Sequence, residues 1–212
     1  MKETLTILHT NDLHGHYDLA LRQSALIKQR KMDLLGQGEH VIVLDGGDFA
    51  DFKSIELQGT KGMAAIELLE AGSYDAITIG NNEMFNGIDT LENMASNSPI
   101  PFISNNLYKK DRSHISGVKS SIILEKNRLR ILLTGSSPDM GVFNEGLGIY
   151  LTDYTNAIKE EITNNEGNYD ICILLSHVGT FADELLAKEI KEIDIIVSAH
   201  DHKLFEQAQV IN

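Results

Sequence analysis

Five short segments of the chain carry side chains that bind metal ions, and each follows a run of residues typical of a β-strand. Their carboxylates, imidazoles and amides are ligand types that divalent cations accept. In chain order the segments are Asp12-Leu13-His14, Gly47-Asp48, Gly80-Asn81-Asn82-Glu83, Ser176-His177 and His200-Asp201-His202. Each segment alone is more common as a turn or a surface loop. Their succession at strand ends predicts one shared site, of the kind that hydrolyses phosphoesters with two metal ions.

Alternating strands and helices are predicted along nearly the whole chain from the spacing of its hydrophobic residues. The expected strands span residues 4–9, 41–44, 76–79, 102–103, 119–124, 129–134, 170–175 and 194–198. The expected helices span residues 19–35, 61–71, 88–96, 153–163 and 181–190, and residues 51–59 and 105–117 are expected to be long loops. Residues 119–134 are predicted to form a hairpin, so antiparallel strands are mixed into an α/β fold. In open α/β sheets, sites form at the carboxyl ends of the strands, where these five segments lie.

The composition is that of an ordinary globular protein. Of 212 residues, 42% are hydrophobic and 23% are charged, and we find no repeat or linker, so a single domain over residues 1–212 is predicted. The formal net charge of −13 disfavours binding to nucleic-acid polymers and to anionic membranes. A small phosphate ligand remains compatible with this charge, because bound cations reverse the local field.

Compartment signals in the sequence are few. The single cysteine, Cys172, lies in an apolar run and cannot form a disulfide within the chain. The first eight residues lack the basic and apolar regions of a secretory signal, and no apolar run approaches the roughly 18 residues of a membrane span. A cytoplasmic location is therefore expected, unless a leader was removed.

The opening His9-Thr10-Asn11-Asp12-Leu13-His14-Gly15-His16 is a near-diagnostic match to the first block of one enzyme family. The chain resembles the calcineurin-like metallophosphoesterases, and within them the bacterial 5′-nucleotidase and 2′,3′-cyclic phosphodiesterase group. The resemblance runs from about Leu5 to the C-terminus. It implies a metallophosphoesterase-type fold, in which two central β-sheets pack face to face between outer helices.

The resemblance also implies a role for each segment. One metal ion would be bound by Asp12, His14 and His202, and a second by Asn81, His177 and His200. Asp48 would bridge the two ions. Such a pair activates a hydroxide for attack on a nucleotide or a related small phosphoester. Ligands without thiolate suit Mn²⁺, Zn²⁺, Fe or Co²⁺, and the sequence does not select among them.

The third block departs from the usual family pattern, which reads Gly-Asn-His-Glu-Phe-Asp. Here Asn82 replaces the His and Phe85 replaces the Asp, as in a branch of the family with Gly-Asn-Asn-Glu. Asn82 would contact phosphate in place of the family His, but an amide cannot deliver a proton to the leaving group. Asn106 is a further candidate for substrate binding, with loop capping as an equal alternative. Asp201 is expected either to orient a neighbouring imidazole or to face solvent.

The end of the chain is a second departure. The catalytic domain of the family usually continues beyond its last His-x-His, and a C-terminal domain then binds the nucleoside base. Only ten residues follow His202 here. The C-terminal part of the fold is therefore expected to be truncated, with the nucleotide-binding domain absent or supplied by a companion chain. Three hypotheses follow: a metal-dependent phosphoesterase, a catalytically impaired protein that binds metal and phosphate, and a structural α/β module without metals.

Overall fold

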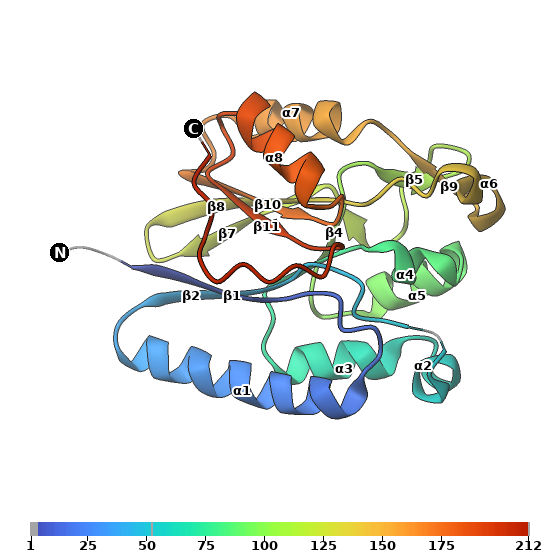
Figure 1. The fold of residues 1–212 in the computed structure, drawn as a ribbon, viewed down its shortest axis with the longest axis horizontal. Helices are drawn as coiled ribbons and strands as arrows, with labels where there is room; N and C mark the ends of the chain where they lie inside the picture. The colour runs from blue at the N-terminus through green and yellow to red at the C-terminus, as the bar shows by residue number, and fades with distance from the viewer. Residues whose placement is uncertain (1–3, 52, 212) are drawn as a thin grey trace.

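Short runs rich in isoleucine, leucine and valine form two β-sheets in the computed structural model, which describes residues 4–51 and 53–211 (Figure 1). The first sheet is parallel throughout and has the order β1 (Leu5–Thr10), β2 (His40–Asp45), β3 (Ala76–Thr78), β4 (Phe102–Ile103) and β6 (Val118–Lys119). The second has the order β11 (Ile195–Ser198), β10 (Ile171–Ser176), β8 (Leu129–Ser136) and β7 (Ser121–Lys126). In the second sheet only β7 is antiparallel to its neighbour.

Helices cover the outer face of each sheet (Figure 1). Below the first sheet lie α1 (Tyr17–Gly36) and α3 (Met63–Ala71), and above the second lie α7 (Tyr154–Asn164) and α8 (Thr180–Glu189). The remaining helices lie toward one end of the sheets: α2 (Ile55–Thr60), α4 (Asn81–Phe85), α5 (Ile88–Asn97), the 3₁₀ turn Gly141–Phe143 and α6 (Asn144–Leu147). The predicted α/β sandwich with flanking helices is confirmed.

Three hydrophobic layers hold this arrangement together. Along β2, Ile42 and Leu44 pack between the two sheets, whereas Val43 packs against the helices of the first sheet. On the other side, Leu132 of β8 and Leu174 of β10 pack against α7 and α8. Because these strands are buried on both faces, they have uninterrupted apolar sequences rather than alternating ones.

The two predicted long loops are partly regular structure, so these predictions were wrong. Within 51–59, which the structure describes apart from residue 52, α2 begins after Ser54, whose hydroxyl accepts a hydrogen bond from the amide of Leu57. Within 105–117, β5 (Leu107–Lys109) pairs with the distant β9 (Ile149–Leu151). The segment after Gly80, also expected to be a loop, contains α4. The prediction that the first eight residues lack a secretory signal concerns a segment of which the structure describes only residues 4–8.

Gly135 in β8 lies in close contact with β3 and β4 of the first sheet. A Cβ atom at this position would be 2.5 Å from both the Ile103 carbonyl oxygen and the Thr78 hydroxyl. Gly135→Ala is therefore expected to lower the free energy of unfolding by about 1–3 kcal/mol, the usual cost of overpacking. Urea unfolding measures the change. Gly146→Ala is the matched control, since nothing lies within 4 Å of a Cβ there, and equal stability of the two variants would contradict the close approach.

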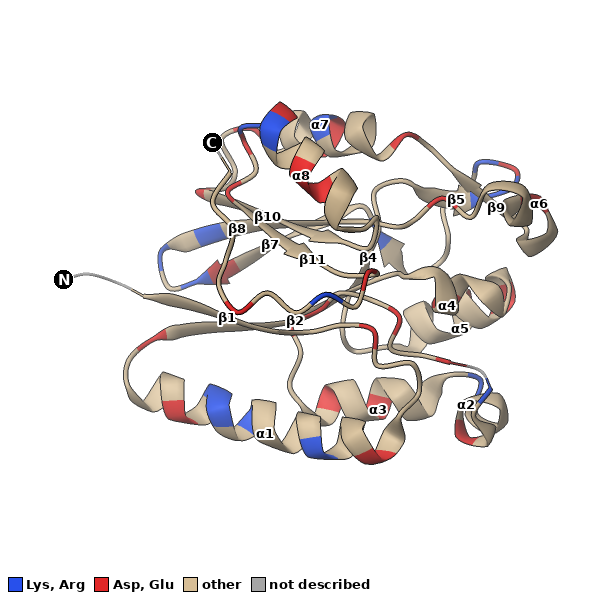
Figure 2. Cartoon of the chain, viewed as in Figure 1, with Lys and Arg blue, Asp and Glu red and all other residues tan. Residues whose placement is uncertain are grey.

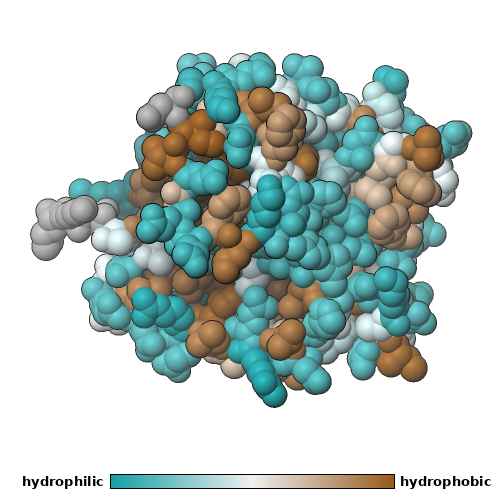
Figure 3. Space-filling view, viewed as in Figure 1, coloured by the Kyte–Doolittle hydropathy of each residue, from teal (hydrophilic) through white to brown (hydrophobic). Residues whose placement is uncertain are grey.

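Charged and hydrophobic side chains are mixed on the face of the molecule shown in Figures 2 and 3. Lys and Arg are scattered over α1, the β7–β8 hairpin and α7, among more numerous acidic residues (Figure 2). On the face shown in Figure 3, hydrophobic side chains form several separate groups between hydrophilic ones. Every helix in the described part of the chain is too short or too polar to cross a membrane.

Candidate metal centre

The loops after β1 and β2 run side by side and bring the first two predicted segments together. The strands are in register up to Thr10 and Asp45. The backbone pairing then continues, because the amide of Asp12 donates to the Gly47 carbonyl and the amide of His14 donates to the Asp48 carbonyl, each at 2.9 Å. The carboxylate of Asp48 therefore lies next to the Asp12–His14 pair.

The second sheet delivers the histidines at the ends of its strands in a similar way. The amide of His177 donates to the Ser136 carbonyl at 3.0 Å, and the amide of Ala199, next to His200, donates to the Ser176 carbonyl at 2.9 Å. The two sheets meet where His177 Nδ1 lies 2.6 Å from the Gly46 carbonyl oxygen. A carbonyl only accepts hydrogen bonds, so Nδ1 carries a proton.

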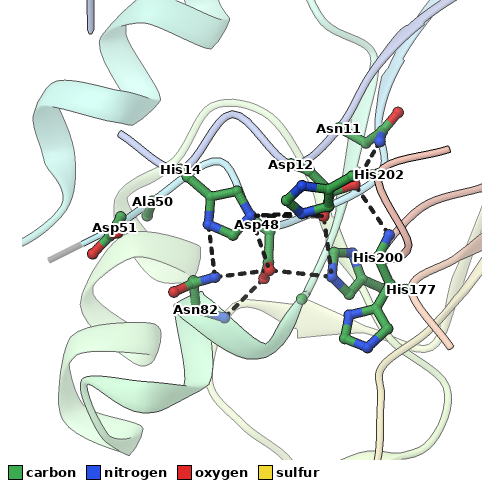
Figure 4. A network of polar contacts seen from close by, with 12 residues as sticks. Asn11, Asp12, His14, Asp48, Ala50, Asp51, Asn82, His177, His200 and His202 are labelled. Atoms are coloured by element: carbon green, nitrogen blue, oxygen red, sulfur yellow. Dashed lines mark hydrogen bonds and ion pairs between the residues drawn. The ribbon is translucent and has the colours of Figure 1, made fainter. Parts of the chain in front are cut away.

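Two groups of side chains result, each able to hold an ion (Figure 4). Asp12, His14 and His202 form one group, and Asp48, His177 and His200 form the other; within each group the ligand atoms lie within 4.8 Å of one another. His202 Nε2 is 3.4 Å from Asp12 Oδ1 and 3.1 Å from His14 Nε2. His177 Nε2 is 3.4 Å from Asp48 Oδ2 and 3.8 Å from Asp12 Oδ1. The two groups are therefore neighbours.

Three buried atoms of the predicted metal ligands have no hydrogen-bond partner: Asp12 Oδ1, Asn81 Oδ1 and His177 Nε2. Buried polar groups are nearly always satisfied, so unpartnered atoms on three predicted ligands require an explanation. All three can donate a lone pair to a cation: a carboxylate oxygen, an amide oxygen, and an imidazole nitrogen whose ring partner Nδ1 holds the proton. These residues fit a pair of divalent ions.

Backbone conformation at the site is unusual. Five residues of the predicted ligand set have positive φ angles, which non-glycine residues seldom adopt: Asp12, His14, Asp48, His200 and His202. Gly47 and Gly80 permit the close approach of the chains, because a Cβ on Gly80 would lie 2.1 Å from Asp48 Oδ1 and one on Gly47 would lie 2.7 Å from the Gly80 amide nitrogen. Strain of this kind concentrates at functional sites.

The charges of Asp48 and His177 support each other. Burial acts to raise the pKa of Asp48, but the neighbouring His177 imidazole, 3.4 Å away, and hydrogen bonds from Asn82 outweigh it and lower this pKa below its ordinary value. Burial acts to lower the pKa of His177, whereas the Asp48 carboxylate and the Gly46 carbonyl raise it to about 9. Without a cation, a proton on His177 therefore compensates the buried negative charge of Asp48.

Glu83 is fully buried and connects the loop after β2 to the loop after β3 by hydrogen bonds. Its carboxylate accepts hydrogen bonds from the amides of Asp48 at 2.9 Å, Ala50 at 2.9 Å and Gly80 at 2.8 Å. Burial raises its pKa to about 8, although the amide donors act in the opposite direction. The sequence analysis assigned no role to Glu83. Its spacing of three residues from Gly80, typical of a side chain that folds back on a helix N-terminus, could have indicated one.

Glu83→Gln is expected to lower the free energy of unfolding by about 1–3 kcal/mol, because one amide N–H of the new side chain would point at a backbone N–H. Thermal or urea unfolding checks this. Glu67→Gln, on the exposed side of α3, is the control and should leave stability unchanged. A Glu83→Gln protein as stable as the wild type would show that these three hydrogen bonds do not hold the loops.

A second buried network lies beneath the loop after β2. The Thr10 hydroxyl donates to Asp45 Oδ2 at 2.5 Å and lies 2.8 Å from the Tyr74 hydroxyl, while Asp45 Oδ1 accepts from the Gly47 amide at 2.9 Å. Burial raises the pKa of Asp45 to about 7. This network was not predicted from the sequence, although an Asp two residues before a Gly is a known turn signal.

The predicted substrate contacts lie in different surroundings. Asn82 is at the site: its side-chain nitrogen is 2.7 Å from Asp48 Oδ2 and 3.1 Å from His14 Nδ1. Asn106 is only 1% exposed, and its amide bonds to the Ser137 backbone through both its nitrogen and its oxygen. A substrate contact by Asn106 would require these bonds to break, and that role stays a prediction.

Comparison with known families matches residues 5–204 to the family described as calcineurin-like phosphoesterase. The chain belongs to this family. The metallophosphoesterase YunD of Bacillus subtilis is 35% identical over 217 residues, which span 100% of this chain and 46% of that protein. The 5′-nucleotidase of Homo sapiens is 27% identical, and the alignment covers 93% of this chain and 38% of that protein. The predicted family is thereby confirmed.

Solved structures agree on the fold of this calcineurin-like domain. The NAD nucleotidase (NadN) of Haemophilus influenzae superposes with a TM-score of 0.80 at 22% identity, over 95% of this chain and 39% of that one. The sulfate thiohydrolase SoxB of Thermus thermophilus gives a TM-score of 0.83 at 19% identity, over 100% and 50% of the two chains. The sequence thus corresponds to less than half the length of the curated relatives named above. The family's description as phosphoesterases agrees with the predicted class of metal-dependent phosphoester hydrolases.

Proposed function

We propose that this domain binds two divalent metal ions and hydrolyses small phosphoesters, with nucleotides as the substrate class. The observation that carries the proposal is the presence of two neighbouring clusters of carboxylate and imidazole, together with buried, unpartnered donor atoms on Asp12, Asn81 and His177. Asp12, His14 and His202 would hold one ion, Asn81, His177 and His200 the other, with Asp48 shared. A bound cation pair supplies activation of water near neutral pH and neutralisation of phosphate charge.

The protein's own residues prepare the site for this chemistry. The hydrogen bond between His177 Nδ1 and the Gly46 carbonyl leaves the lone pair of Nε2 directed into the site. The amide and side chain of Asn82 both donate to Asp48 and so fix the orientation of its carboxylate. The side-chain nitrogen of Asn82 lies at the edge of the clusters, where it would contact a phosphate oxygen without supplying a proton.

Nucleotides are proposed because relatives of this chain are nucleotidases by name, including a 5′-nucleotidase and an NAD nucleotidase. The reaction would be of the 5′-nucleotidase or 2′,3′-cyclic nucleotide phosphodiesterase type, in nucleotide catabolism. Since the relatives are more than twice as long as this chain, we propose that a further domain or a companion chain recognises the nucleoside base.

Bulk properties support the remaining parts of the proposal. The net charge of −13 disfavours nucleic-acid polymers and anionic membranes as partners. A cytoplasmic location stays a prediction.

A second candidate function is a catalytically impaired protein that binds metal and phosphate. The observation that favours it is the pair Asn82 and Phe85: the Asn82 amide is engaged with Asp48 and His14, and the Phe85 side chain is 47% exposed and has no proton to give. Loss of a general acid typically costs about 10²–10⁴-fold in rate, which reduces activity without abolishing it.

Turnover assays after removal and return of metal distinguish the two. We expect the chelated protein to be inactive, and added Mn²⁺ to restore hydrolysis of bis(4-nitrophenyl) phosphate, 4-nitrophenyl phosphate and 2′,3′-cyclic AMP. Metal binding without any turnover of these substrates would favour the impaired protein. Absence of metal binding would overturn both functions and leave a structural α/β module.

A further inference from the structure

We infer that Asp201, through Thr180 at the start of α8, is the positioning residue that holds His202 in the metal centre. The inference deepens the proposed function and rests on it. It concerns one half of the site, the cluster of Asp12, His14 and His202. It predicts that Asp201, which would contact neither ion, affects the binding of the ion in this cluster and not that of the other ion.

Asp201 is tied to the first residue of α8 rather than to an imidazole. Its Oδ2 accepts hydrogen bonds from the Thr180 amide at 2.7 Å and from the Thr180 hydroxyl at 2.5 Å. The Thr180 hydroxyl in turn accepts from Lys203 Nζ at 2.9 Å. Thr180 is 7% exposed and belongs to a helix packed on the second sheet, so its position is set by the fold. Asp201 and Lys203, by contrast, are exposed.

His202 has no comparable anchor of its own. Among the described residues, the hydrogen bonds that tie Asp201 and Lys203 to the rest of the fold all end on Thr180. The His202 backbone lies between these two residues in a left-handed conformation, with φ of 52°, and its side chain is 59% exposed. The imidazole of His202 contacts Asp12 and His14 at the site. On either side of it, the chain is held by the hydrogen bonds of Asp201 and Lys203 to Thr180, which we call the Asp201–Thr180–Lys203 clamp.

His200 is held independently of this clamp. Its amide donates to Asp12 Oδ2 at 3.0 Å, and its neighbour Ala199 continues the pairing with β10 through Ser176. Its cluster partners His177 and Asp48 are buried and bonded to the two sheet-end loops. Loss of the clamp should therefore disturb the ion at Asp12, His14 and His202 and leave the other ion in place.

Gly179 makes room for the Asp201 carboxylate. Its φ of 95° suits glycine, and a Cβ there would lie 3.2 Å from Asp201 Oδ1. The turn before α8 thus leaves room for the carboxylate to reach the helix N-terminus, where a negative charge is also favoured by the helix dipole.

Metal titration of three variants tests the inference. Asp201→Ala removes both hydrogen bonds to Thr180, and we expect one of the two Mn²⁺ dissociation constants to weaken by about 10–100-fold, as for other residues that orient metal ligands. Asp201→Asn keeps an oxygen that can accept both bonds and should bind both ions within a few-fold of the wild type. Asp153→Ala is the matched control, since Asp153 caps α7 through the Asn156 amide at 2.8 Å and is equally exposed.

The Asp153→Ala control distinguishes the loss of a helix cap from the loss of the position of His202. Asp201→Ala and Asp153→Ala should both lower the melting temperature of the metal-free protein by about 2–4 °C, and Asp153→Ala should leave both dissociation constants unchanged. Equal metal binding by wild type and Asp201→Ala would overturn the inference, as would an Asp201→Asn protein that loses the ion as fully as Asp201→Ala. A wild type that binds no metal would instead overturn the proposed function.

Discussion

Replacing Asp48 by asparagine is expected to lower kcat/KM for phosphodiesters by about 10³-fold or more. The carboxylate belongs to the cluster with His177 and His200, is only 2% exposed and lies 3.8 Å from His14 Nε2 of the other cluster. In the proposed site it is shared by both ions. Metal ions contribute several kcal/mol of charge stabilisation to phosphoryl transfer, and each 1.36 kcal/mol corresponds to a factor of ten in rate. Asparagine removes the negative charge and places an amide N–H2 near the donors of Asn82 and His177.

Steady-state kinetics and metal titration on the same Asp48→Asn sample measure this effect. The control is Asp170→Asn, because Asp170 pairs with Arg130 just before β10, at the opposite end of that strand from His177. The control should lose its ion pair and keep its activity. An Asp48→Asn protein with wild-type turnover and two bound ions would contradict the shared role of the carboxylate.

Introducing a proton donor at the metal centre, at positions 82 and 85, is expected to give the second-largest effect on kcat/KM. The present chain should favour aryl phosphates, whose leaving groups need little protonation, over alkyl phosphates. Asn82→His combined with Phe85→Asp places a histidine and a partner carboxylate in α4, and we expect kcat/KM for alkyl phosphates to rise by about 10²-fold relative to aryl phosphates.

The measurement is the dependence of kcat/KM on the pKa of the leaving group, in the wild type and in the double variant. Phe85→Asp alone is the control, because an exposed carboxylate without the histidine supplies no oriented acid. If the wild type showed a flat dependence, or if the double variant left the slope unchanged, the missing general acid would not explain the difference from other family members.

Much of the fold could be predicted from the sequence, and so could the clustering of six candidate metal ligands at strand ends. Continuous apolar runs such as Val41–Leu44 marked strands buried on both faces, and the polar segments that end these strands converge as expected. Parallel pairing makes that convergence a geometric consequence of sheet order, because the carboxyl ends of neighbouring strands share one edge.

Other features depend on contacts between residues distant in sequence and were not predictable. β5 exists because it pairs with β9, some 40 residues later. Glu83 acquires its role only when the loops after β2 and β3 are brought within reach of one carboxylate. Asp201 was expected to orient an imidazole or face solvent, but its partner proved to be Thr180, 21 residues earlier on a helix.

An anomalous difference map from crystals of the wild-type protein soaked in Mn²⁺ tests the two-ion site most directly. We predict two peaks per chain, one among Asp12, His14 and His202 and one among Asn81, His177 and His200, with Asp48 between them. Peaks at other residues, or a map without peaks under conditions in which Mn²⁺ binds in solution, would contradict the proposed centre.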